Sequence, residues 1–207
     1  MRTFPIGGIH PHDNKEWSKD KAIEILELPD EAKIPMIQHI GAPSNPVVKK
    51  GDKVLTGQLI GQSTGYVSAN IHATISGTVT AVDAYPNGQG QRRLMVVIKR
   101  EGDEWMPEID RTPDHKRECT LAPNEIIDKI REAGIVGLGG AQFPTHVKLA
   151  IPDGQKADTL IVNGVECEPY LTSDYRNMLE RAEMMLTGIE ITMRALGVER
   201  AVIGVEN

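Results

Sequence analysis

The stretch Gly137-Leu138-Gly139-Gly140-Ala141-Gln142-Phe143-Pro144-Thr145-His146-Val147-Lys148-Leu149 decides how the second half of this 207-residue chain is interpreted. Four of its first five residues are small, and small residues let a backbone approach a ligand closely. Free N–H groups at a helix start favour phosphate, and Lys148 adds a positive charge for the same anion. The stretch therefore predicts a loop that binds a phosphate-bearing ligand, with a tight surface turn as the alternative.

The segments on either side of this loop alternate between helical and strand patterns. A predicted helix at 125–133 precedes the loop and ends at Gly134. A Rossmann dinucleotide site needs a strand before its loop and three glycines in it, so this loop does not fit that motif. Beyond the loop, Thr159–Asn163 and 201–205 are apolar runs that predict parallel strands.

Between those two strands the sequence predicts one long helix, capped by Ser173 or Asp174. The apolar residues of this helix keep a helical spacing: Met178, Met185, Ile189, Met193 and Leu196. The alternation of strands and helices predicts an α/β domain over 123–207. No crossover helix follows the last strand, although a parallel strand ordinarily feeds one, so we expect a truncated domain.

Residues 34–100 form a β unit of short strands separated by Gly, Pro and Asn. The strands are predicted at 53–55, 58–60, 77–82 and 94–98, with a turn at 85–88. Two half-motifs, Lys50-Gly51-Asp52-x-Val54-x-x-Gly57-Gln58-x-Ile60 and Ile71-x-Ala73-x-x-x-Gly77-x-Val79, resemble those of biotinyl and lipoyl domains, which fold as a barrel-sandwich hybrid. Tyr66 stands where those carriers have their modified lysine, which implies a structural or docking domain instead of a swinging arm.

We therefore expect an α+β multi-domain protein with four parts. Residues 1–33 are an N-terminal extension that packs on the β unit, with a strand at 23–28 where apolar residues alternate. Residues 34–100 are the biotinyl- or lipoyl-like barrel-sandwich hybrid domain, and the polar stretch 101–122 is a linker. Residues 123–207 are the first part of the α/β domain.

The composition argues against several classes of function. With 23 Lys and Arg against 29 Asp and Glu, the net charge is −6, which argues against nucleic acid as a partner. The longest aliphatic run, 94–98, is far shorter than a bilayer span, so membrane association must come through partners. The cysteines, Cys119 and Cys167, have no metal-type spacing, and His10 with His12 makes a poor ligand set, so we expect no metal site in this chain.

A second polar motif, Asn163-Gly164-Val165-Glu166-Cys167-Glu168-Pro169, closes the strand at 159–163. Open α/β sheets bind ligands beyond the carboxyl ends of their strands. Glu166 and Glu168 are two residues apart, so an extended backbone would point both side chains the same way. Such a pair is typical of acid–base chemistry in retaining hydrolases, or of hydrogen bonding to a bound ligand, or of a solvated charged loop.

Together these motifs resemble two related families. The glycine-rich stretch and the Asn-x-x-Glu-x-Glu-Pro string are similar to the NADH-oxidising subunit of respiratory complex I and the C subunit of the Rnf electron-transport complex. Gly7-Gly8-Ile9-His10-Pro11 and Gln38-His39-Ile40-Gly41-Ala42-Pro43 resemble the Rnf family alone. This sequence departs from the pattern at Gln142, in place of a third glycine, and at Val165, in place of an aspartate near the ribityl chain.

The resemblance implies that the domain binds FMN and NAD(H) and that hydride passes directly between these cofactors, without a catalytic side chain. Lys148 would then meet the phosphate, Phe143 would form an aromatic wall for the nicotinamide nucleotide, and Asn163 would contact the ribityl chain. Glu166 and Glu168 would hydrogen-bond ribose or carboxamide groups. The full set of expected cofactor-binding residues is Gly137, Gly139, Gly140, Ala141, Phe143, Lys148, Asn163, Glu166 and Glu168.

The resemblance also implies a larger assembly. The C subunits of Rnf complexes carry two [4Fe–4S] clusters in a ferredoxin-like region, which has no counterpart here, so we expect those clusters only in a missing C-terminal region. The implied partners are the other Rnf subunits, including membrane subunits, NADH, and ferredoxin through the complex, at the cytoplasmic face of the bacterial inner membrane. The coupling ion, Na⁺ or H⁺, stays open. A cobalamin reductase of a bacterial microcompartment and a non-catalytic docking scaffold are the alternatives.

Overall fold

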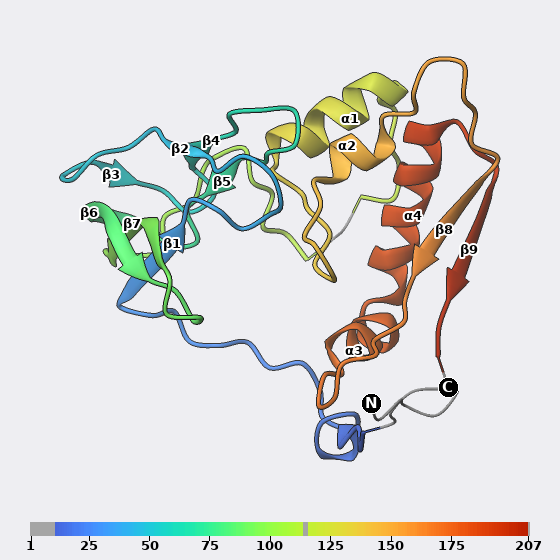
Figure 1. Ribbon diagram of the computed structural model, residues 1–207, viewed down its shortest axis with the longest axis horizontal. Coiled ribbons are helices and arrows are strands. Elements are labelled where there is room, and N and C mark those ends of the chain that lie inside the picture. The colour runs from blue at the N-terminus through green and yellow to red at the C-terminus, as the bar shows by residue number, and fades with distance from the viewer. Residues whose placement is uncertain (1–10, 114–115, 207) are drawn as a thin grey trace, which may run out of the picture. The chain divides into compact units, whose positions relative to one another are not determined.

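The computed structural model describes residues 11–113 and 116–206, and the chain divides into two compact units (Figure 1). The central unit consists of Glu27–Lys156. In the terminal unit, the start of the chain up to Leu26 joins Ala157–Asn207. The motif at 7–11, with His10, lies outside the described residues except for Pro11.

Two antiparallel sheets form the framework of the central unit. The first has the order β1-β7-β6-β3, from β1 (Glu31–Pro35), β7 (Arg92–Arg100), β6 (Gly77–Pro86) and β3 (Lys53–Val54). The second has the order β2-β4-β5, from β2 (Asn45–Pro46), β4 (Leu59–Gln62) and β5 (Ile71–His72). The hairpin turn lies at Asn87, slightly later than predicted, where the Asn87 N–H donates to Gln91 O at 2.8 Å.

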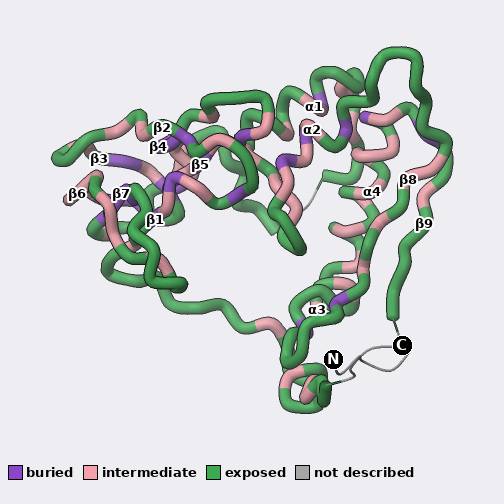
Figure 2. Tube along the Cα trace, viewed as in Figure 1, coloured by how far each residue is buried: buried purple, intermediate pink, exposed green. Residues whose placement is uncertain are grey.

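Apolar side chains of both sheets pack into one core. Val79 and Ile98 of the first sheet and Ile60 of the second have no exposed surface. Burial alternates at the start of β6, whereas the four consecutive residues 95–98 of β7 are all buried. Figure 2 shows the buried residues of the central unit gathered on these strands. The arrangement confirms the predicted barrel-sandwich hybrid. Tyr66 is exposed and lies in the connection between β4 and β5 of this domain.

Helices α1 (Pro123–Glu132) and α2 (Thr145–Leu149) belong to the same unit. Asn70 Nδ2, in the connection between β4 and β5, donates to Glu132 O at 3.1 Å. Gly134, with φ at +67°, lies so close to Asn70 that a Cβ would stand 2.1 Å from the Asn70 carbonyl oxygen. We predicted a domain boundary between residues 122 and 123, whereas the compact unit Glu27–Lys156 continues across it, and these contacts fasten the end of α1 to the β4–β5 connection.

The predicted linker also differs in part from the structure. Thr56 N donates to Glu104 O at 2.9 Å, and Met106 N donates to Thr56 O at 3.0 Å. The beginning of the 101–122 segment is therefore paired with the β sheets and does not connect two separate domains.

The terminal unit is built on two parallel strands, β8 (Thr159–Asn163) and β9 (Arg200–Gly204), as predicted. The predicted single helix between them is wrong, because the chain forms α3 (Ser173–Glu180) and α4 (Ala182–Leu196) with a break at Arg181. Glu180 to Glu183 are good helix formers or neutral, so propensity does not predict a break here. Instead, α3 is held by the start of the chain, since Arg176 Nη1 donates to Lys19 O at 3.0 Å.

The N-terminal extension packs differently from the prediction. Residues 13–23 hydrogen-bond to the terminal unit and include a 3-10 turn, η1 (Lys15–Trp17). The predicted strand at 23–28 is wrong: no strand forms there, and Ile25 and Leu26 are 93% and 87% exposed. Alternation favours a strand only where a neighbouring strand supplies hydrogen bonds, and this segment has no such neighbour among the described residues.

No helix of the described chain is long and apolar enough to cross a bilayer.

The contact at Gly134 predicts a sharp difference between two glycine substitutions. Gly134→Ala should lower the free energy of unfolding by about 2 to 4 kcal/mol, from left-handed strain plus the clash with Asn70. Gly90→Ala is the matched control, because Gly90 has φ at +77° and open space around it, and should cost only about 1 kcal/mol. Urea unfolding followed by circular dichroism measures both. Equal losses would show that α1 is not fixed to the β4–β5 connection.

Candidate functional site

The glycine-rich stretch forms a loop closed at its base. Val136 pairs with Pro144 in an antiparallel bridge, and Gly137 N donates to Phe143 O at 2.9 Å. Thr145 N donates to Ile135 O at 2.9 Å just outside that bridge. The base is therefore fixed while the tip projects, with Leu138 90% exposed.

The tip of this loop is open to a ligand. A Cβ added at Gly139 or Gly140 would meet no heavy atom within 4 Å. Gly140 has φ at +60°, and Gln142 has φ at +52° although it is not a glycine. A left-handed conformation costs an L-residue about 1 kcal/mol or more, which explains why a glycine suits position 142. The loop keeps its shape with Gln142, at the expense of some backbone strain.

Lys148 lies directly over the base of the loop. A Cβ at Gly137 would stand 2.5 Å from Lys148 Nζ, so the ammonium group occupies the space that a side chain at 137 would need. Lys148 itself is exposed, and Phe143 is half-buried at the end of the loop. The structure therefore brings Gly137, Phe143 and Lys148 together, with Gly139, Gly140 and Ala141 at the tip.

His146 anchors the helix that begins after the loop. Its side chain is buried, and its Nδ1 has no hydrogen-bond partner among the described residues. Burial lowers the pKa of His146, and the positive charge of Arg131 lowers it further. A hydrogen bond with the Tyr66 backbone acts in the opposite direction and raises the pKa. A neutral imidazole thus joins α2 to the β4–β5 connection, next to the place where a carrier domain would have its lysine.

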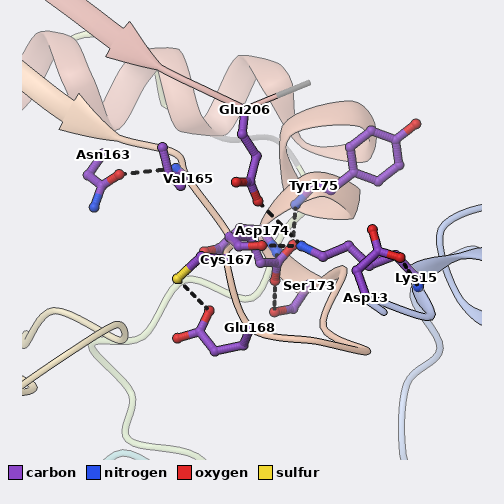
Figure 3. Close-up of polar contacts among 11 residues, drawn as sticks. Asp13, Lys15, Asn163, Val165, Cys167, Glu168, Ser173, Asp174, Tyr175 and Glu206 are labelled. Atoms are coloured by element: carbon purple, nitrogen blue, oxygen red, sulfur yellow. Dashed lines mark hydrogen bonds and ion pairs between the residues drawn. The ribbon is translucent and has the colours of Figure 1, made fainter. Parts of the chain in front are cut away.

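The second motif begins where the two parallel strands of the terminal unit end (Figure 3). Asn163 is paired with Gly204, and Gly164 N donates to Gly204 O at 2.8 Å. Asn163 Oδ1 accepts a hydrogen bond from Val165 N at 3.1 Å. The side chain of Asn163 therefore shapes the turn after β8, at the edge where open parallel sheets bind ligands.

Glu166 caps helix α3 from a buried position. The side chain is 6% exposed, and Oε1 accepts hydrogen bonds from Ser173 Oγ (2.9 Å) and Asp174 N (3.0 Å). Oε2 accepts from Tyr175 N at 3.3 Å. Burial would raise the pKa of Glu166, but these three hydrogen bonds and the charge of Lys15 lower it below its ordinary value. Ser173 and Asp174, which we predicted as cap residues, instead supply donors to a carboxylate seven and eight residues earlier in the chain.

Glu166 and Glu168 therefore have different surroundings. Glu168 is exposed, with Oε2 3.9 Å from Cys167 Sγ, and does not share the buried cap. Burial raises the pKa of Asp174, and the charges of Glu166 and Glu168 raise it further. Both carboxylate oxygens of Glu166 are engaged by the cap and its pKa is lowered, whereas the general acid of a retaining hydrolase needs a raised pKa, so Glu166 does not fit that role.

A cavity of about 720 Å³ opens beside this turn. Glu166 and Cys167 line it from the turn, Tyr175 and Met178 from α3, and Lys15 from the start of the chain. Its size is in the range of small-molecule sites, and its lining combines apolar surface with a few charged groups. The cavity belongs entirely to the terminal unit.

Lys15, Tyr170 and Glu206 were not predicted from the sequence. Lys15 Nζ donates to Glu166 O and lies 3.6 Å from Glu206 Oε1. The sequence contains a signal that could have predicted Glu206 as a site residue. It follows β9 as Glu166 follows β8, and the carboxyl ends of parallel strands lie at the same edge of a sheet. Lys15 had none, since it is 151 residues away from its partner in the chain.

Known protein families match both halves of the chain. Residues 3–103 match the family described as the RnfC barrel sandwich hybrid domain, and residues 130–207 match the Nuo51 FMN-binding domain. The chain belongs to the RnfC family. The Nuo51 match includes both candidate stretches, 137–148 and 163–168, although the structure places them in different units.

Several curated RnfC proteins are similar to the chain. It is 50% identical over 202 residues to the C subunit of the proton-translocating ferredoxin:NAD(+) oxidoreductase complex of Clostridium ljungdahlii, covering 97% of the chain and 44% of that relative. It is 46% identical over 204 residues to the Na(+)-translocating counterpart of Acetobacterium woodii, covering 97% and 45%. The C subunit of the ion-translocating oxidoreductase complex of Rhodobacter capsulatus is 44% identical over 211 residues, covering 100% and 40%. The chain spans less than half the length of these RnfC relatives.

The capping role of Glu166 predicts a pH-dependent loss of stability. Glu166→Gln should lower the free energy of unfolding of this RnfC chain by about 1 to 2 kcal/mol at neutral pH. The folded pKa of Glu166 lies below its ordinary 4.5, so the carboxylate stabilises the fold fully above that pH. That contribution disappears as the pH falls through the folded pKa, so the variant and the wild type should converge in acid.

Glu168→Gln is the matched control, because Glu168 is exposed in the same turn. It should change the free energy of unfolding by no more than about 0.5 kcal/mol. Urea unfolding at neutral and acid pH measures both variants. A loss at Glu168 as large as that at Glu166 would contradict the cap.

Proposed function

We propose that this chain binds FMN and NAD(H) as a redox subunit of an Rnf-type, ion-translocating ferredoxin:NAD oxidoreductase complex. The observation that carries the proposal is the open glycine loop with the Lys148 ammonium close to Gly137. That loop lies within the part of the chain that matches an FMN-binding domain. Backbone N–H groups of a glycine loop near a cation are suited to binding a monophosphate.

Within this proposal, the residues of the chain bind and orient the cofactors and carry out no bond-making step. The tip, from Gly139 to Ala141, lets a flat ring system approach the backbone, and Lys148 neutralises the phosphate. Phe143 gives an apolar surface beside the loop. When bound, FMN supplies an acceptor for the hydride of NADH and returns the electrons singly.

The Asn163–Glu168 turn, in the terminal unit, would contribute polar contacts to a nucleotide. Asn163 and Glu168 are exposed and can hydrogen-bond ribityl, ribose or carboxamide groups. Glu166 is buried and already accepts three hydrogen bonds, so its role in this proposal is to fix the turn. Glu166 was predicted as a direct ligand contact; we now propose that it acts through the turn.

The larger assembly is proposed from the names of the relatives. They are named as the C subunits of ferredoxin:NAD(+) or ion-translocating oxidoreductase complexes, so we propose other members of such a complex, some in the membrane, as partners. A [4Fe–4S] cluster takes four thiolates, and this sequence has two cysteines, so the proposed clusters are bound outside residues 1–207. We propose that ferredoxin exchanges electrons through the complex, at the cytoplasmic face of the membrane.

Two alternatives predict different results. A microcompartment cobalamin reductase would use the same flavin site with another acceptor, and the three relatives named above favour the Rnf assignment. A non-catalytic scaffold would use the barrel-sandwich hybrid for docking and would not depend on the glycine loop. FMN binding therefore separates the redox and scaffold functions.

The loop tip provides the test. Gly140→Val should weaken FMN binding about ten- to hundred-fold, because the branched side chain fills the space that the ring system needs. Gly154→Val is a matched control, since Gly154 has φ at +80°, open space around it, and a position outside the loop. Both variants carry a β-branched residue at positive φ, so their stabilities should fall together. FMN fluorescence titration measures the affinity. Equal FMN affinity in both variants would show that the loop tip does not hold FMN, and absence of FMN binding in the unaltered chain would favour the scaffold.

A further inference from the structure

Residues 13–23 lie along the segment just after the Asn163–Glu168 turn, and we call them the strap. The strap makes polar contacts with four places in the terminal unit: the turn at Glu166, Tyr170, Thr172 and helix α3. These contacts join parts of the chain that are more than 150 residues apart. A segment fixed at so many points is an integral part of the terminal unit.

The strap holds Tyr170 in a strained conformation. Tyr170 has φ at +69°, which costs a residue with a side chain about 1 kcal/mol or more. Its N–H donates to Asp13 O at 2.6 Å, and its carbonyl accepts a hydrogen bond from Ser18 Oγ at 3.2 Å. Its ring packs at a tilt against Trp17, with 5.5 Å between the centroids. Such strain persists only where the surroundings determine the backbone from several sides, and here the strap does so.

The strap also joins the ends of the two parallel strands. Lys15 donates to the Glu166 carbonyl and pairs with Glu206 after β9 (Figure 3). Its side chain is only 21% exposed, so this ion pair is less screened than a surface pair. Lys15 therefore fixes the backbone of the turn, in addition to the cap on the Glu166 carboxylate.

Helix α3 is held by the remainder of the strap. Arg176 Nη1 donates to Lys19 O at 3.0 Å, and Ile23 N donates to both carboxylate oxygens of Glu180 at 3.1 and 3.2 Å. Arg176 and Glu180 are also paired with each other along the helix. The strap thus fixes the chain both before and after the strained Tyr170.

We propose that Trp17 and Ser18 of the strap are positioning residues for the nicotinamide nucleotide: they hold Tyr170, and through it the exposed Glu168, where a nucleotide can bind. This inference rests on the proposed function. The match to the RnfC barrel sandwich hybrid domain spans the strap, which nevertheless packs on residues within the Nuo51 FMN-binding match. The beginning of the chain thus serves the site formed near its end.

The test uses the full 207-residue chain and a double variant, W17A/S18A. NADH should bind at least tenfold more weakly to the variant, and the amides of residues 166–176 should exchange with deuterium at least tenfold faster. Trp17 is 64% exposed, so its removal leaves the cores intact, and urea unfolding of the central unit should not change. The conservative single variant Trp17→Phe keeps an aromatic ring against Tyr170 and should bind NADH with the affinity of the wild type. W105A, which changes the other tryptophan, in the central unit, is the matched control and should bind NADH like the wild type.

The outcomes separate the two proposals. Wild-type NADH affinity in W17A/S18A overturns the role of the strap and leaves the proposed function in place. If the unaltered chain binds neither FMN nor NADH, the proposed function and the nucleotide-positioning role both fail. Hydrogen exchange then shows separately whether the strap holds the turn. Equal weakening in W105A and W17A/S18A would also overturn the proposal.

Discussion

A carboxylate that leaves water needs hydrogen-bond donors, and the terminal unit is arranged around this requirement at Glu166. The first turn of α3 supplies the donors, and the positive end of the helix dipole favours the charge. The direction of α3 and the path of the chain after β8 both depend on this contact. Because Glu166 points inward, its neighbours Val165 and Cys167 are left exposed on the turn.

Patterns that depend on neighbouring residues predicted much of the fold. Four strands of the barrel-sandwich hybrid (β3, β4, β6 and β7) and the parallel pair β8 and β9 were predicted from strand patterns and apolar runs, whereas β1, β2 and β5 were not predicted. The errors occur where distant contacts decide the structure. Residues 23–28 have the alternation of a strand but no strand to pair with among the described residues, and helix α3, which ends at the break at Arg181, is hydrogen-bonded to the start of the chain through Arg176.

The candidate site was partly predictable for the same reason. The glycine loop is closed by hydrogen bonds among its own residues, and Lys148 Nζ lies close to Gly137. The role of Glu166 as the cap of α3 was not predictable from its spacing. In an extended segment, Glu166 and Glu168 would have had equivalent surroundings. Only the position of α3 distinguishes these glutamates, by giving one of them three donors and leaving the other in water.

The joining of residues 13–23 to the end of the chain has a consequence for folding order. The strap is synthesised before its partners at 166–180, which emerge some 150 residues later, so it stays unpaired while the central unit is completed. Contacts so distant in sequence form late, because loop closure must precede them. The barrel-sandwich hybrid can fold as soon as its own strands are made, whereas the terminal unit is assembled after it. The two segments of the terminal unit are separated in the sequence by a unit that has already folded.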